Sequence, residues 1–461
     1  MDTSDTICAL STPQGTGAIA VIRVSGEKAI TICDKIFRHN NPSKKLSDQP
    51  SHSLNYGVIV NKESIIDDVV ISLFKAPMSY TGENSIEISC HGSIYIQQKI
   101  IELLIDNGIR MAKPGEFTLR GFLNGKFDLS QAEAVNDLIL SNSRTSHDLA
   151  IDQMRGGYSS KIKNLRQKLV KFASLLELEL DFSEEDVKFA DRSELMKLLK
   201  DSAKEIKILI KSFSYGNVIK KGIPITIIGK PNVGKSTLLN ALLNEEKAIV
   251  SEIPGTTRDV IEDNINIGGM LFRFIDTAGL RKPKDRIEDI GIEKTYEKIK
   301  QAAVILYVFD ISETNFTEIN NIIDELKYNI NDNTKKIILI ANKTDKLIEI
   351  PEGFKDFVEL ETIFISAKRK ENIHLIAESL LKSFKKKNVG DVIVSNVRHY
   401  EALTKALKAL KNIEKGLKKD IPVDLLDIDV REALNHLGEI TGEITNDELL
   451  DNIFSNFCIG K

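Results

Sequence analysis

A glycine-rich loop between a strand pattern and a helix pattern is the feature that most constrains the fold of this chain. The segment Gly229–Ser236 reads Gly-Lys-Pro-Asn-Val-Gly-Lys-Ser, a full match to G-x-x-x-x-G-K-[ST]. The apolar run Ile225–Ile228 precedes it, and Thr237–Leu243 has helical spacing. In that setting backbone N–H groups and the helix dipole converge on phosphate groups. The sequence therefore predicts a phosphate loop in which Lys235 reaches the β- and γ-phosphates and the Ser236 hydroxyl holds Mg²⁺.

A second motif downstream of the loop indicates which base is bound. Asn342-Lys343-Thr344-Asp345 follows the apolar run Lys336–Ala341, which we expect to be a buried strand. The Asp345 carboxylate can accept hydrogen bonds from N1–H and from the exocyclic amino group of guanine. Adenine has no such donor pair and would leave a carboxylate unpaired, which is costly. The sequence therefore predicts that the nucleotide is GTP.

Three further segments lie where a GTP site needs them. In Gly255–Asp259 a switch loop can offer a threonine to Mg²⁺, and both Thr256 and Thr257 are candidates. Asp276–Gly279 ends a strand pattern, so its carboxylate can hold the metal through bound water and its last N–H can contact the γ-phosphate. Ser366-Ala367-Lys368 follows the last strand pattern and would support the base. The predicted GTP-binding residues are Asn232, Val233, Gly234, Lys235, Ser236, Thr237, Ser251, Glu252, Ile253, Pro254, Gly255, Thr256, Thr257, Asp276, Thr277, Ala278, Gly279, Asn342, Lys343, Thr344, Asp345, Ser366, Ala367 and Lys368.

Two residues depart from the Ras pattern. Leu280 stands where Ras-like proteins carry the glutamine that orients the attacking water, and leucine cannot hydrogen-bond water. Either GTP hydrolysis is slow or another group positions the water. Asn232 can face the α- and γ-phosphates, where a bound monovalent cation would neutralise the developing charge. The alternative for Asn232 is a loop residue that bonds its own backbone.

Composition limits the classes of protein that fit. A chain of 461 residues is too long for one core, so we expect two to four domains. The sequence has no run of eighteen apolar residues and starts with an acidic segment, so we expect neither a membrane span nor a signal peptide. The four cysteines lack metal-ligand spacing, which favours reduced thiols and a cytoplasmic location. The net charge of −4 means that any RNA contact needs a local patch or a partner.

The predicted secondary structure changes along the chain. Residues 1–118 predict an α+β domain, because they mix short strand patterns with one helical pattern. The expected strands are Ala18–Val24, Asp68–Phe74 and Ser85–Ser89, and the expected helix lies near Ile94–Ile105. Residues 119–215 are helical in period, and residues 216–383 alternate strands and helices around a mostly parallel sheet. The strands expected in this sheet are Ile225–Ile228, Leu271–Ile275, Val304–Phe309, Ile337–Ala341 and Thr362–Ile365. Residues 384–461 again have the spacing of apolar residues that is typical of helices. The predicted fold is therefore an α+β domain followed by a helical domain into which a P-loop GTPase domain is inserted, because insertion at exposed loops is tolerated.

Motifs at both ends resemble one family, the MnmE (TrmE) tRNA modification GTPases. The resemblance covers the whole chain. The segments that carry it are Asp5–Ile7, Thr12-Pro13, Arg23–Gly26, Ser79–Glu83, His91-Gly92, Pro114–Thr118, Arg120, Phe122–Lys126, Asp128-Leu129, Gln131–Ala134 and the terminal Phe457–Lys461.

The resemblance implies a homodimer whose N-terminal domain binds 5-formyltetrahydrofolate or a related tetrahydrofolate. With a flavoprotein partner, MnmG, in a heterotetramer or larger complex, such proteins place a carboxymethylaminomethyl-type group on carbon 5 of the wobble uridine (position 34) of certain tRNAs. It implies no role for membrane or DNA. Glu288 would orient the water and act with Lys235 in catalysis. The implied ligands are Arg23, Glu83, Lys126 and Lys461 for folate, Ser236 and Thr257 for Mg²⁺, and Asn232, Ser251, Ile253 and Thr256 for K⁺.

Several questions stay open at the level of sequence. Cys458 is a candidate reactive thiol, since Lys461 lies close in the chain, but it can equally be a small apolar packing residue. The main alternative function is a GTP-dependent ribosome-assembly or signalling switch, and a folate-binding module with a vestigial GTPase domain is the other. The family motifs outside the GTPase segment favour tRNA modification. The sequence leaves open which tRNAs are modified and whether glycine or ammonium supplies the nitrogen.

Overall fold

The structure is a computed structural model that describes residues 4–181, 192–245, 263–275, 299–330, 335–349, 360–384, 392–419 and 421–461. The chain forms two compact units. The first comprises Met1–Ile139, Ile151–Ala203 and Lys405–Lys461, and the second comprises Leu140–Ala150 and Lys204–Thr404. The predicted boundaries after residues 118, 215 and 383 divide the chain more finely than these units and stay predictions.

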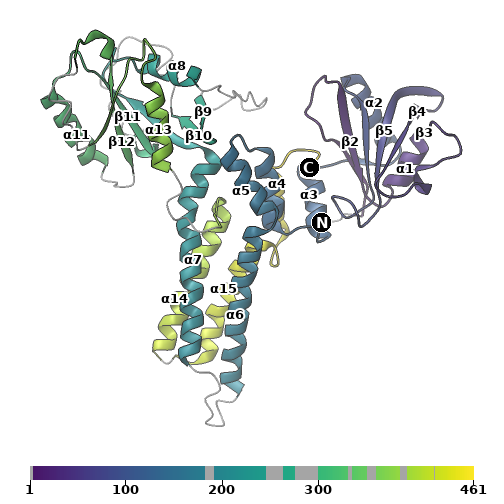
Figure 1. Ribbon diagram of the computed structural model, residues 1–461. Helices are drawn as coiled ribbons and strands as arrows, with labels where there is room; N and C mark the ends of the chain where they lie inside the picture. Colours follow the sequence, from purple (N-terminus) through teal and green to yellow (C-terminus); the bar gives the residue numbers. More distant parts are fainter. Residues whose placement is uncertain are drawn as a thin grey trace. The chain divides into compact units, whose positions relative to one another are not determined.

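The first unit begins with a seven-stranded sheet in the order β3-β4-β5-β6-β2-β1-β7 (Figure 1). Neighbouring strands are antiparallel except β1 and β7, which are parallel. The strands are β1 (Ile7–Leu10), β2 (Ile19–Ser25), β3 (Phe37–His39), β4 (Ser53–Asn61), β5 (Ser64–Phe74), β6 (Ser85–His91) and β7 (Arg110–Met111).

Alternation along β1 joins this sheet to two different cores. Cys8 lies in the core that α1 (Ala29–Ile36) and α2 (Ile94–Asp106) form on one face of the sheet. Its neighbours Ile7 and Ala9 point to the opposite face and pack with Phe117 of α3 (Glu116–Leu123). Successive strand side chains point to opposite faces, so one short strand connects both layers.

The helices of the first unit continue from α3. Helix α15 contacts α6 and α4, α3 contacts α4, and α16 contacts α3. The last turns of the chain thereby return to the N-terminal domain, with Leu450 and Phe454 packed beside Leu119 and Leu129. The helices are α4 (Leu129–Ile139), α6 (Gly157–Asp181), α15 (Val423–Thr441) and α16 (Asp447–Phe454), while α5 (Arg144–Met154), α7 (Arg192–Lys221) and α14 (Val397–Lys418) extend from one unit into the other.

The second unit contains a six-stranded sheet in the order β13-β12-β11-β8-β10-β9. All neighbouring pairs are parallel except β9 and β10. Figure 1 shows α8 and α13 beside this sheet and α11 by β11 and β12. The elements are β8 (Ile223–Ile228), α8 (Lys235–Glu245), β9 (Asp263–Ile267), β10 (Met270–Phe274), β11 (Val304–Asp310), α11 (Phe316–Ile330), β12 (Lys336–Asn342), β13 (Glu361–Phe364) and α13 (Ile373–Phe384).

The central strand β11 is buried on both faces. Val304, Leu306 and Val308 pack with α8 and α13, whereas Ile305 and Phe309 pack with α11. A strand covered by helices on both sides reads as a continuous apolar run, which is how β11 was recognised in the sequence. The predicted fold class, a P-loop α/β domain inserted into a helical domain and preceded by an α+β domain, is confirmed. Within the described residues, no helix has the length and apolarity needed to span a bilayer.

Candidate functional site

The phosphate loop leaves β8 through a residue that must be glycine. Gly229 has φ +146°, and a Cβ atom there would lie 2.0 Å from the Val308 carbonyl oxygen of β11. At the other end of the loop, the Lys235 ammonium donates to the carbonyl oxygens of Gly229 and Lys230, each at 2.7 Å. Burial lowers the pKa of Lys235 because it disfavours the charged form. A phosphate anion beside the ammonium would offset that cost, so the loop is suited to bind one.

Asn342 connects three predicted nucleotide-binding segments. It is 2% exposed, its Nδ2 donates to the Val233 carbonyl oxygen at 2.8 Å, and its Oδ1 accepts from the Ala367 N–H at 3.0 Å. Gly234, with φ +98°, permits this approach, since a Cβ atom there would lie 2.3 Å from Nδ2. The phosphate loop, the end of β12 and the segment after β13 are therefore held together by one amide.

Asp345 is prepared as a hydrogen-bond acceptor. The Ser366 hydroxyl donates to its Oδ1 at 2.6 Å, and this bond is the main reason why the pKa of Asp345 lies below its usual value. The positive charges of Arg369 and Lys368 act in the same direction. The neighbouring Thr344 N–H donates to the Ile365 carbonyl oxygen at 3.2 Å. An ionised, oriented carboxylate is what a guanine donor pair requires.

A carboxylate that the sequence reading missed anchors Lys343. Asp310, at the end of β11, is 3% exposed and accepts from the Lys343 ammonium at 2.7 Å and the Lys346 ammonium at 3.3 Å. Burial alone would raise the pKa of Asp310, but the bonds from Lys343 and Ser312 outweigh it and lower the pKa to about 2. Its position directly after an apolar strand, next to the strand that ends in Asn342-Lys343, was the available signal.

The structure describes only part of the predicted metal and catalytic sets. Asn232 has φ +60° and is exposed, while Ser236 and Thr237 lie in the first turn of α8. Within the described ranges, no three His, Cys, Asp or Glu side chains are grouped so as to hold a metal ion. The predicted residues outside the described part of the chain are Ser251, Glu252, Ile253, Pro254, Gly255, Thr256, Thr257, Asp276, Thr277, Ala278, Gly279 and Glu288, together with Leu280.

The C-terminal tail lies against the N-terminal sheet. Arg23 of β2 donates through Nη1 to the Gly460 carbonyl oxygen at 3.2 Å and pairs through Nη2 with Glu87 of β6 at 2.8 Å. The Ser11 hydroxyl donates to the same Gly460 oxygen at 3.2 Å. Burial, and then the nearby Arg23, lower the pKa of Lys461. Of the predicted folate ligands, Arg23 and Lys461 are thus brought together.

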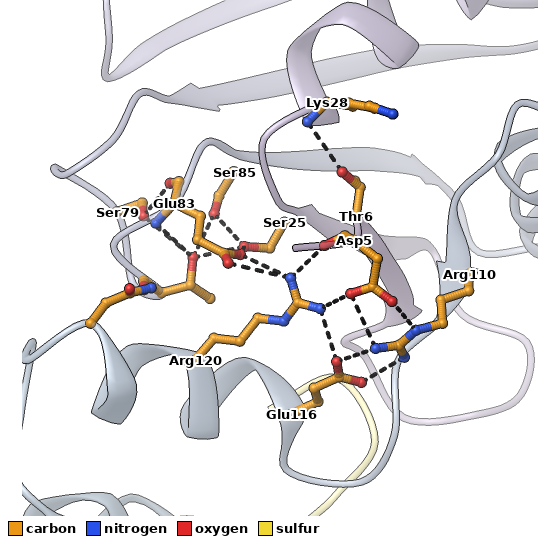
Figure 2. Close-up of polar contacts among 12 residues, drawn as sticks. Asp5, Thr6, Ser25, Lys28, Ser79, Glu83, Ser85, Arg110, Glu116 and Arg120 are labelled. Carbon is orange, nitrogen blue, oxygen red and sulfur yellow. Dashed lines mark hydrogen bonds and ion pairs between the residues drawn. The ribbon is translucent and has the colours of Figure 1, made fainter. Parts of the chain in front are cut away.

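Glu83 and Lys126 form the second half of the predicted folate set. Gly82 lies against Lys126, because a Cβ atom there would be 3.4 Å from Cδ of the lysine. The Lys126 ammonium donates to the Pro77 carbonyl oxygen at 2.9 Å. Figure 2 shows Glu83 facing Arg120 and Ser25, which bind it directly. The loop that carries Glu83 also carries Tyr80, whose ring lies 5.4 Å from the Arg23 guanidinium.

The cysteines divide into two kinds. Cys8, Cys33 and Cys90 are buried and Cys458 is exposed, and all of them are free thiols. Burial raises the pKa of Cys8 to about 12 and that of Cys90 to about 11, which makes these thiols inert at neutral pH. The Cys458 carbonyl oxygen accepts from the Gly115 N–H at 3.3 Å, so its backbone is fixed beside α3. Exposure keeps Cys458 a candidate reactive thiol.

Two protein families match this chain over most of its length. Residues 6–126 match the family described as the N-terminus of the GTP-binding protein TrmE. Residues 129–458 match the family described as the MnmE helical domain.

Similar full-length proteins carry the name tRNA modification GTPase MnmE. The protein from Flavobacterium psychrophilum is 54% identical over 463 residues, which is 99% of each chain. The protein from Christiangramia forsetii is 53% identical over 478 residues and covers 100% of both chains. That from Bacteroides fragilis is 52% identical over 466 residues, 99% of each.

Proposed function

The chain belongs to the MnmE family of tRNA modification GTPases and is a GTP hydrolase that takes part in tRNA modification, and we propose that its target is carbon 5 of the wobble uridine. In this proposal a homodimer acts in the cytoplasm with the flavoprotein MnmG. A tetrahydrofolate supplies the one-carbon unit of a carboxymethylaminomethyl-type group. The two family matches, over residues 6–126 and 129–458, favour this reading over a ribosome-assembly or signalling switch.

The observation that carries the GTPase part is the bridge made by Asn342. It connects the phosphate loop with the base-reading segment, while Ser366 holds Asp345 as an acceptor. Phosphate binding and guanine selection are therefore parts of one hydrogen-bonded unit. We assign Asn232–Thr237, Asn342–Asp345 and Ser366–Lys368 to GTP, with Ser236 and Thr257 as ligands of Mg²⁺.

The proposed folate site is supported by the charges of the four side chains assigned to it. Arg23, Lys126 and Lys461 are cations suited to the carboxylates of a glutamate tail, and Glu83 is an acceptor suited to pterin N–H groups. The bond from Arg23 to the Gly460 oxygen keeps the chain end beside the sheet. Cys458 is exposed in the same segment and is a candidate nucleophile there.

The cation part rests on what the GTPase segment offers. Leu280 cannot orient water, and the family resemblance implies that Glu288 takes that role. It likewise implies Asn232, Ser251, Ile253 and Thr256 as the oxygen ligands of K⁺. Asn232 adopts the left-handed backbone conformation in the phosphate loop and is exposed, which leaves its side chain accessible to an ion.

Reconstitution with omission of single components tests the proposal. The assay combines the purified chain with MnmG, an unmodified substrate tRNA, GTP, Mg²⁺, K⁺, a methylene or formyl tetrahydrofolate, and glycine or ammonium as the nitrogen source. It should yield a modified wobble uridine by mass spectrometry. Leaving out the tetrahydrofolate or GTP should each abolish the product. A product formed without tetrahydrofolate would refute the one-carbon role, and a change at another nucleotide would refute the assigned target.

A further inference from the structure

The N-terminal domain contains an ionic cluster, centred on the buried side chains of Arg120 and Glu116, that the nucleotide chemistry does not use (Figure 2). The carboxylates of Asp5, Glu83 and Glu116 share the guanidinium groups of Arg110 and Arg120. Three negative and two positive charges leave the cluster with an excess of one negative charge. Asp5 and Glu116 each contact both guanidinium groups, whereas Glu83 contacts Arg120 alone. The excess is therefore greatest at Glu83.

Glu83 is more exposed to solvent than Arg120, the arginine that binds it. The side chain of Arg120 is 0% exposed and that of Glu83 is 17% exposed. Burial alone would raise the pKa of Glu116 and of Asp5, but the bonds from Arg110 and Arg120 outweigh it and hold both below their usual values. The guanidinium group of Arg120 is thus paired with carboxylates of the protein, while Glu83 can still be reached from solvent.

The carboxylate of Glu83 is held on both oxygens but is not saturated. The Ser25 hydroxyl donates to Oε2 at 2.7 Å, and Nη1 of Arg120 lies 3.3 Å from each oxygen. Nη1 gives one of its two hydrogens to the Asp5 carbonyl oxygen at 2.7 Å, so Arg120 and Ser25 supply one hydrogen each to Glu83. A carboxylate has about four lone-pair sites, which leaves about two of them open to further donors. Two parallel N–H groups can therefore bind to Glu83 without displacing either partner.

A chain of hydroxyl groups fixes the direction of the Ser25 bond. A hydroxyl has a single proton, and because the Glu83 carboxylate only accepts, Ser25 donates its proton to Glu83. Ser25 then accepts from the Thr81 hydroxyl, 2.7 Å away. The backbone of Glu83 is also held, since its N–H donates to the Thr81 oxygen at 3.2 Å and its carbonyl accepts from Ser79 at 2.6 Å. Every bond that orients this carboxylate exists before a ligand arrives.

We propose that Ser25 and Arg120 are positioning residues that fix Glu83 as a preorganised acceptor for the paired N–H donors of a 2-amino-4-oxopteridine ring. The inference rests on the folate site of the proposed function and adds to it the residues that orient the ligand. The ring presents a ring N–H and an exocyclic amino group side by side, and one carboxylate accepts both in parallel. Orientation before binding lowers the entropic cost of association.

Two serine variants of the full-length dimer test the proposal. Ser25→Ala removes the bond to Glu83 and should weaken the binding of 5-formyltetrahydrofolate about tenfold in calorimetry. Ser85→Ala is the matched control, because the Ser85 hydroxyl contacts Ser25 and Thr81, each at 3.2 Å, but makes no hydrogen bond to Glu83. We expect less than a twofold change for Ser85→Ala. Equal losses in the two variants would overturn the proposal.

A double-mutant cycle separates positioning from a general effect on the fold. Glu83→Gln removes the acceptor pair, so adding Ser25→Ala to it should cause no further loss of affinity. A 2-desamino analogue of the folate should bind wild type and Ser25→Ala equally. Additive losses in the double variant, or equal sensitivity of the analogue, would show that Ser25 acts only on stability.

Arg120 is tested with its own control, because a buried arginine supports the fold as well. Arg120→Lys should weaken folate binding, whereas Arg110→Lys, which leaves the Glu83 contacts intact, should not. Melting temperatures of both variants check that the domain folds. If Arg120→Lys does not fold, the Ser25→Ala and Ser85→Ala variants decide the question. Wild type that binds no reduced folate would overturn the folate site and this inference together. Wild type that binds while Ser25→Ala has no effect would overturn only the inference.

Discussion

Asp345 offers the most direct single-residue test of base recognition. Asp345→Asn replaces an acceptor by an amide whose NH₂ group opposes the guanine donors. GTP affinity should fall roughly 100-fold or more, about 3 kcal/mol, and xanthosine triphosphate should become the preferred nucleotide because its 2-oxo group accepts. Titration with fluorescent GTP and XTP measures both affinities. Unchanged GTP affinity would mean that Asp345 does not read the base.

Asp310 gives a test that depends on pH. Its pKa is about 2 in the folded chain against 3.8 for an unperturbed group, so its contacts stabilise the fold by about 2 kcal/mol when both states are ionised. A depressed carboxylate pKa gives stability that is present above pH ~4 and is lost as pH falls toward ~2. Asp310→Asn should lower the free energy of unfolding at pH 7, and the gap to wild type should narrow below pH ~4. A gap that is constant with pH, in urea unfolding, would contradict the ion-pair explanation.

At the residue scale, polar residues that belong to sequence motifs were predicted. The residues that position them through hydrogen bonds and ion pairs were not. Asn342, Asp345 and Ser366 were named because fixed motifs contain them. Arg120 was quoted for the family resemblance but not assigned a role, and neither Ser25 nor Asp310 was assigned one. Their contacts join residues that are distant in the chain, such as Arg120 with Asp5, and no local pattern reports such pairs.

At the element scale, runs of apolar residues predicted the buried strands well. The expected strands at Val304–Phe309 and Ile337–Ala341 correspond to β11 and β12 within one residue at either end. The edge strand β9 was missed because Asp263–Ile267 alternates polar with apolar residues over only five positions. In the first sheet, β1, β3, β4 and β7 were missed as well. Two of these have three residues or fewer, so their pairing partners rather than their sequences define them.

Gly234 tests the connection between the phosphate loop and β12. Gly234→Ala would strain a backbone with φ +98° and would place a methyl group 2.3 Å from Nδ2 of Asn342. We expect a loss of GTP affinity of about tenfold or more and a lower melting temperature of the second unit. Gly108→Ala is the control, since its φ is +91° but nothing lies within 4 Å of the added Cβ atom. If both variants bind GTP as wild type does, the Asn342 bridge is not needed for the site.

At the scale of the whole molecule, the C-terminal residues test whether folate binding can be separated from GTP turnover. Removing the last four residues takes away Cys458, Gly460 and Lys461 and so the tail that Arg23 holds. GTP turnover should stay nearly intact, whereas folate binding in calorimetry and tRNA modification should be lost. Equal folate binding by the truncated and full-length chains would refute this placement of the ligand.

The cation prediction follows from the absence of a glutamine after Gly279. An arginine finger normally adds ~10³-fold or more to GTP hydrolysis, and a K⁺ ion at Asn232 is proposed to take its place. The rate should rise steeply when Na⁺ is replaced by K⁺ at constant ionic strength. Asn232→Ala should flatten this response, and Glu288→Ala should keep dimer association of the GTPase domains but lose turnover. Equal rates in Na⁺ and K⁺ would return the search to a finger residue from the partner.

The central claim is that GTP binding by this chain supports modification of the wobble uridine. Its most direct test is mass spectrometry of tRNA nucleosides from cells that lack the gene and are complemented with variants. We expect the carbon-5 modification of the wobble uridine to disappear in the deletion, to return with wild type and not to return with Asp345→Asn. Wobble uridines that stay fully modified in the deletion would contradict a role of this chain in that modification.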